Sequence, residues 1–142
     1  MRNGTGLVVA IAIGALVLAR GAARAQERDE PDPCKDTKTL GDTARCWARE
    51  SDHADSEMKQ LYLTALEKLP HRGAENLKKA QKLWQDFREA HIATLLGDPN
   101  PVATYGPEYP MCLSILRWRL ARDRTAELRR LLQPDDESVC PL

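Results

Sequence analysis

The chain has 142 residues, a length that suits a single domain. Its 21 Lys and Arg side chains balance 21 Asp and Glu side chains, and residues 26–142 carry 18 basic and 21 acidic ones. A slightly acidic chain is not expected to bind nucleic acid or anionic membranes in general, because both require an excess of positive charge.

Residues 1–25 have the pattern of a secretory signal peptide. Arg2 supplies the basic start, residues 7–18 form an apolar run, and an Ala-Arg-Ala cleavage site occupies residues 23–25. The apolar run is shorter than the ~20 residues that span a bilayer. Cleavage would leave Gln26, not a cysteine for lipid attachment, at the new N-terminus. The sequence therefore predicts a periplasmic or secreted protein that has no membrane anchor after cleavage.

All four cysteines lie in the exported part, where an oxidising compartment favours disulfides over free thiols. Their even number indicates two disulfides. They form no Cys-x-x-Cys motif and the three histidines are scattered, so we expect no metal site and no cofactor. These residues are Cys34, Cys46, Cys112 and Cys140, with His53, His71 and His91.

The exported part is predicted to hold an extended lead-in, residues 26–38, and an all-α domain with an acidic tail, residues 39–142. Apolar residues recur at helical spacing over residues 39–69, 74–96 and 111–132, which predicts a bundle of three main antiparallel helices stapled by disulfides. A turn at residues 70–73 joins the first two helices. Four prolines within residues 97–110 predict a loop without helix.

Helical periodicity also predicts which residues face inward. The inner face of the first helix comprises Trp47, Ser51, Ala54, Asp55, Met58, Leu61, Tyr62, Ala65 and Leu69. The inner face of the second comprises Leu77, Ala80, Trp84, Phe87, His91 and Leu95, with Gln81 and Arg88 in its middle. The third helix directs Leu113, Leu116, Leu120, Arg124, Leu128 and Leu131 inward.

Gln81 and Arg88 need polar partners because an unpaired amide or guanidinium on an apolar face is costly. A hairpin that pivots between residues 71 and 72 sets Asp55 opposite Arg88 and Tyr62 opposite Gln81. We therefore expect a partly buried Asp55–Arg88 ion pair and a Tyr62–Gln81 hydrogen bond, which would fix the register of the two helices.

The same residues carry a resemblance to a known family. Residues 54–62 (ADSEMKQLY) resemble the aDxeLNxxY segment of the LprI-type lysozyme-inhibitor family, and residues 81–88 resemble its QxxWxxfR segment. Residues 124–128 resemble its R-x-x-E-L ending, although either Arg124 or Arg119 can be the family arginine. The resemblance covers residues 34–132 and implies a small, exported, helical and disulfide-bonded protein.

Several positions depart from the family pattern. Ile92 occupies the place of a family cysteine four residues after the motif arginine, Lys59 replaces an asparagine, and Cys140 is an addition. Gly106-Pro107 stands where the family has Gly-Ser in its loop. The disulfide pattern must therefore differ from that of the family in at least one bridge.

Three helices of alternating direction place Cys34, Cys46 and Cys112 near one end of the bundle. This favours Cys34–Cys46 together with Cys112–Cys140. The second bridge requires the tail to run back along ~30 Å of helix, and eight extended residues reach about 26–29 Å. The pairing of Cys46 with Cys112 and of Cys34 with Cys140 therefore stays open.

Asp52, His53 and Asp55 form a polar cluster near Ser51 and Ser56, which is a candidate catalytic site. A helix spreads residues 52, 53 and 55 over about 300°, so they cannot converge as a triad. The sequence has no Gly-rich phosphate loop and no Gly-x-Ser-x-Gly motif. We expect no catalytic residues and a protein that is not an enzyme.

The resemblance implies lysozyme as the partner. Such an inhibitor can block a muramidase cleft with exposed loop side chains, and Tyr105 and Glu108 are the candidates. Alternatively, the chain is an interaction module that binds another envelope protein. Met111, Ile115 and Trp118 point away from the leucine face of the third helix and would then form an apolar patch, unless the lead-in or the tail covers them.

Overall fold

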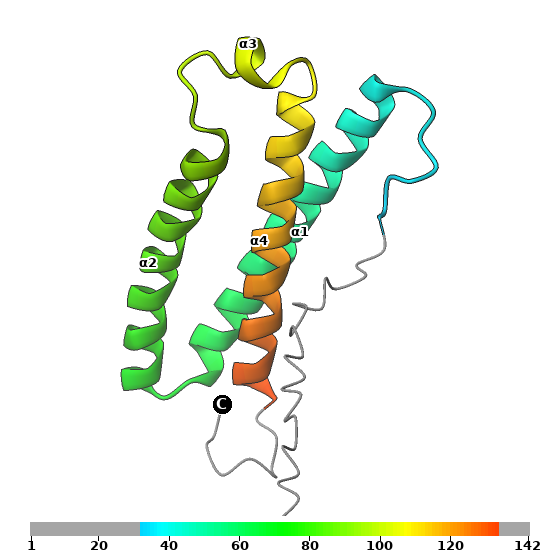
Figure 1. The fold of residues 1–142 in the computed structure, drawn as a ribbon. Helices are drawn as coiled ribbons and strands as arrows, with labels where there is room; N and C mark the ends of the chain where they lie inside the picture. The colour runs from blue at the N-terminus through cyan, green and yellow to red at the C-terminus, as the bar shows by residue number, and fades with distance from the viewer. Residues whose placement is uncertain (1–31, 134–142) are drawn as a thin grey trace, which may run out of the picture. The chain divides into compact units, whose positions relative to one another are not determined.

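The computed structural model describes residues 32–133. Within this range the chain forms four helices, α1 (Leu40–Lys68), α2 (His71–Leu96), α3 (Pro101–Tyr105) and α4 (Tyr109–Leu132), and no strand. The predicted all-α class is confirmed. α1 and α4 run in the same direction, α2 runs opposite to both, and α3 bridges the ends of α2 and α4 (Figure 1). The predicted signal peptide, residues 26–31 of the lead-in and the tail with Cys140 lie outside the described residues.

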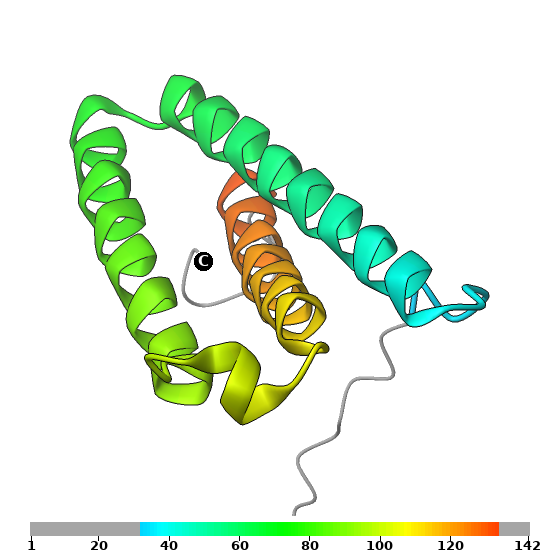
Figure 2. The same ribbon diagram turned by 90° about the horizontal axis from the view of Figure 1, so that it is seen from above.

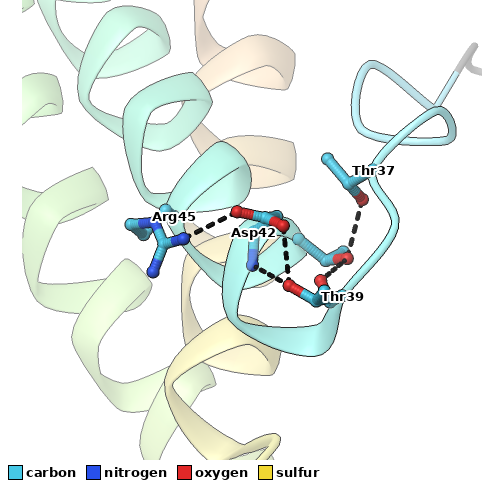
Figure 3. A network of polar contacts seen from close by, with 5 residues as sticks. Thr37, Thr39, Asp42 and Arg45 are labelled. Atoms are coloured by element: carbon cyan, nitrogen blue, oxygen red, sulfur yellow. Dashed lines mark hydrogen bonds and ion pairs between the residues drawn. The ribbon is translucent and has the colours of Figure 1, made fainter.

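A side-chain network fixes the start of α1 (Figure 3). The Thr39 hydroxyl accepts a hydrogen bond from the backbone N–H of Asp42 at 3.1 Å and donates to the carboxylate of Asp42 at 2.7 Å. Arg45 lies 2.6 Å from the other carboxylate oxygen. The bond from Thr39 and then that from Arg45 lower the pKa of Asp42 below its ordinary value. Since Thr39 precedes the first helical residue, it acts as a side-chain N-cap.

Two element boundaries differ from the prediction. α2 begins at His71 directly after Pro70, whose carbonyl accepts a bond from the N–H of Ala74 at 2.9 Å, so the turn is Leu69-Pro70 instead of residues 70–73. The expectation of a loop without helix over residues 97–110 is wrong, because this segment contains α3. Pro101 stands in the first turn of α3, where its missing N–H leaves no helical bond unmade.

The core is built chiefly where α1 packs against α4. α4 lies in the space bounded by α1, α2 and α3 (Figure 2), and its contact with α1 is far more extensive than its contact with α2. Small side chains allow the two backbones to approach, since Ala54 and Ala65 of α1 and Ala121 of α4 are buried. The α1–α2 hairpin that the sequence suggested is therefore secondary to the pairing of α1 with α4.

One apolar cluster surrounds the start of α1. Trp47 and Trp118 pack edge to face with ring centroids 5.1 Å apart, and Cys34 and Cys46 lie beside them in a disulfide with 5.8 Å between their Cα atoms. The first predicted pairing is thus confirmed for Cys34–Cys46, and the alternative that joins Cys46 to Cys112 is wrong. Cys112 has no disulfide partner within residues 32–133, and its predicted bridge to Cys140 stays a prediction.

A second apolar cluster lies toward the α1–α2 turn. Its buried members are Met58, Ala65, Leu77 and Leu128, and six partly buried side chains pack around them. The predicted inner face of α1 is largely confirmed, because Trp47, Ser51, Ala54, Met58 and Ala65 are all buried.

The inner faces predicted for the other two helices are partly wrong. α4 buries Trp118, Ala121, Thr125 and Leu128, whereas Leu131 is 41% exposed. The leucine-rich side of α4 is not its inner face, because close contact with α1 requires small residues. α2 buries Leu77, Gln81 and Ile92, whereas Ala80, Phe87 and Leu95 are exposed. The buried residues of α2 therefore follow the polar middle of the predicted inner face, and the apolar residues at its edge are exposed.

Candidate functional site

A partly buried ionic contact joins α1 to α2. Arg88 places Nη1 2.8 Å from Oδ1 of Asp55 and donates from Nη2 to Oδ2 at 3.0 Å. The Arg88 side chain is 11% exposed and that of Asp55 is 38% exposed. Nη2 also contacts the carbonyl of Arg117 at 3.4 Å, and the guanidinium lies over the ring of Trp84 at 5.5 Å. The predicted Asp55–Arg88 ion pair is confirmed.

The predicted Tyr62–Gln81 hydrogen bond is wrong. The amide oxygen of Gln81 accepts from Nε of Arg124 at 3.0 Å, and its amide nitrogen lies 3.7 Å from the sulfur of Met58. Tyr62 is partly buried in the second apolar cluster. The reason is that α4 occupies the position opposite this part of α2, so the polar group that meets Gln81 comes from α4 instead of α1.

These contacts explain the residues that carry the family resemblance. Asp55 and Arg88 pair across α1 and α2, and Gln81 and Arg124 pair across α2 and α4. Of the two candidate arginines, Arg124 is the one that contacts Gln81. Since all four side chains hold helices together, the motif specifies the register of the bundle.

A polar cleft of about 320 Å³ opens beside the ion pair, where the three long helices converge. α1 contributes residues at helical spacing, α2 contributes two adjacent residues and α4 contributes two residues three apart. The lining consists of Ala48, Ser51, Asp52, Asp55, Arg88, Glu89, Ser114 and Arg117.

This cleft brings together three of the five polar residues of the cluster weighed as a catalytic site. Ser51, Asp52 and Asp55 line it, whereas His53 and Ser56 do not. A hydroxyl nucleophile needs an adjacent base oriented by a third group, and Asp55 is already engaged by Arg88. The arrangement suits binding of a polar group better than nucleophilic chemistry.

Sequence reasoning missed the other half of the cleft. Glu89 follows the motif arginine directly, and Ser114 and Arg117 lie one turn apart on α4. Their helical spacing was visible in the sequence, but it marks a site only once the position of α4 between α1 and α2 is known.

The two candidate loop residues flank a sharp bend at the end of the bundle. Tyr105 ends α3 and stacks on Tyr109 with 6.0 Å between ring centroids, and Glu108 precedes α4. Gly106 between them has a φ of 73°, a conformation that favours glycine. A Cβ at this position would also lie 2.9 Å from the carboxylate of Glu108. The segment from Pro101 to Pro110, called the arch below, is thus a defined turn and not an open loop.

The apolar patch predicted on the third helix is not a surface patch. Trp118 is 5% exposed and packs on Trp47, and Met111 and Ile115 are partly buried against the same cluster. Residues of α1 cover them, and of the two covers expected from the sequence the lead-in contributes Cys34. These residues therefore contribute to the core.

The fold and the buried contacts define a small helical domain that a disulfide cross-links. An ion pair between two of its helices fixes their register. The sequence matches the family described as "Lysozyme inhibitor LprI" over residues 34–128, and the chain belongs to this family. No curated protein and no solved structure matches the chain significantly. In the part of the chain that the structure describes, no helix has the length and apolar character that crossing a membrane requires.

Proposed function

We propose that this protein is an exported, non-enzymatic inhibitor of lysozyme. The observation that carries the proposal is the family match, which extends from Cys34 of the disulfide to Leu128 in the core of α4. The Cys34–Cys46 disulfide supports export, because such bonds persist in oxidising compartments. The signal-peptide pattern of residues 1–25 supports it independently.

The arch is our candidate for the surface that enters the muramidase cleft. It projects from one end of the bundle (Figure 1), and Val102 is 60% exposed at its start. Three backbone bonds brace it, from Gly106 N to Val102 O, from Tyr109 N to Gly106 O and from Cys112 N to Glu108 O. A braced turn loses little conformational entropy on binding. Glu108 is exposed and can meet a basic rim of an enzyme cleft.

The test is a cell-wall lysis assay with c-type, g-type and i-type lysozymes and the oxidised protein that begins at Gln26. We expect inhibition at micromolar inhibitor, and the double variant Tyr105→Ala/Glu108→Gln should raise the half-inhibitory concentration at least about tenfold. The matched control is Leu83→Ala/Glu67→Gln, which removes an apolar side chain and a charge from exposed positions on α2 and α1.

The outcomes separate two claims. Full lysozyme activity with every enzyme type at saturating protein would reject the inhibitor function itself. Equal inhibition by the arch variant and the wild type would reject the arch and leave inhibition to another surface. Export is tested by N-terminal sequencing of the periplasmic protein, which should begin at Gln26.

A further inference from the structure

The polar cleft carries two carboxylates without an ionic partner. Asp52 of α1 and Glu89 of α2 both line it, and both are exposed. Neither forms an ion pair with any of residues 32–133, whereas Asp55 is held by Arg88. When Asp55 and Arg88 offset each other, two carboxylates remain against the single guanidinium of Arg117. The lining therefore has a net negative charge.

Ser51 gives an independent indication that this cleft receives a ligand. The residue is 5% exposed and lines the cleft, yet its hydroxyl has no hydrogen-bond partner among the described residues. Its oxygen is not among the fully buried side-chain atoms that lack a partner, so it can be reached from the cleft. Other serines nearby donate to a carbonyl one turn earlier, as Ser56 does to Asp52 at 2.9 Å and Ser114 does to Pro110 at 3.0 Å. The Ser51 oxygen remains available as an acceptor in the cleft wall.

We propose that this cleft binds one basic side chain, lysine or arginine, presented by a partner protein. The cation lies between the carboxylates of Asp52 and Glu89 and donates a hydrogen bond to Oγ of Ser51. An apolar side chain is disfavoured, because it would displace water from a lining in which only Ala48 is apolar and would form no hydrogen bond in return. An anion would face two unpaired carboxylates for one guanidinium, so its charge is disfavoured.

This inference goes beyond the inhibitor function, because the cleft lies between the shafts of the helices and not in the arch. Where the partner is a lysozyme, the inference rests on that proposed function. Small basic probes can be tested without any lysozyme, so the failure of one proposal can be told from the failure of the other.

The experiment titrates the 15N-labelled, oxidised protein that begins at Gln26 with N-acetyl-lysine methylamide and N-acetyl-arginine methylamide. We expect saturable amide shifts at residues 51, 52, 89 and 114 with millimolar Kd values, which weaken as salt is raised. N-acetyl-glutamate methylamide should not change the chemical shifts of these amides. Equal or larger shifts with the glutamate probe, or no shifts with either basic probe, would overturn the proposal.

Charge variants then test the assignment to the two carboxylates. The double variant Asp52→Asn/Glu89→Gln should raise the Kd of the basic probes about fivefold to tenfold. The matched control Asp36→Asn/Glu67→Gln removes the same charge from two exposed positions outside the cleft and should leave Kd unchanged. Equal weakening by both variants would show a general charge effect and refute the site. An intact response in a protein that fails to inhibit lysozyme would reject only the inhibitor function.

Discussion

The Asp55–Arg88 contact should couple the stabilities of α1 and α2 by about 1–2 kcal/mol. A buried ion pair that loses one partner costs about 3–5 kcal/mol, and an exposed pair contributes about 0.2–1 kcal/mol. Arg88 is close to the buried limit with 11% of its side chain exposed, whereas Asp55 at 38% still reaches water, which discounts the larger figure. The two nitrogen–oxygen contacts, at 2.8 and 3.0 Å, favour a value above that of an exposed pair.

The assay is a double-mutant cycle of Asp55→Asn and Arg88→Gln, read as the free energy of unfolding from urea titrations of the oxidised protein. The same cycle on Lys82→Gln and Asp86→Asn is the control. That pair lies within α2 with side chains 75% and 61% exposed, so its coupling should stay at about 0.3–0.5 kcal/mol. A coupling for Asp55 and Arg88 within about 0.3 kcal/mol of zero would refute the reasoning. Mutations at residues that do not interact change the free energy of unfolding additively to about that accuracy.

Two further predictions concern the cluster around the start of α1. Trp118→Ala should lower the free energy of unfolding by about 3–5 kcal/mol, because it removes the partner of Trp47 from the core; a loss below about 1 kcal/mol in urea denaturation would show that the ring is not packed there. Replacement of Cys34 and Cys46 by alanine should cost about 3 kcal/mol, as expected for a bridge with a sequence separation of 12. Thermal unfolding of this variant and the wild type measures that loss, and coincident transitions would argue against the bridge.

The sequence predicted the helices and one of the two polar contacts well. Helical periodicity placed the three long helices within a few residues of their observed ends, because their boundaries follow from local signals such as Pro70 and Gly97. The contact of Asp55 with Arg88 followed from the hairpin geometry alone. It required only that α1 and α2 be neighbours joined by a short turn.

The position of α4 could not be predicted in the same way. Nothing in local periodicity indicates that Ala121 of α4, rather than a leucine, would meet Ala54 of α1. Because the inward face of α4 was predicted wrongly, Trp118 was assigned to a surface patch instead of the core, and Gln81 was given the wrong partner. The cleft depends on the same placement, since its lining from α4 is defined only after three helices have been assembled.

The pairing of α1 with α4 has a consequence for the order of folding during synthesis. The alanines that close this contact are separated by most of the domain in sequence, so their approach is a late, non-local event. A nascent chain that ends before Trp118 has made α1 but has no surface on which to bury Trp47. The apolar cluster around the start of α1 is therefore completed only once α4 has been synthesised.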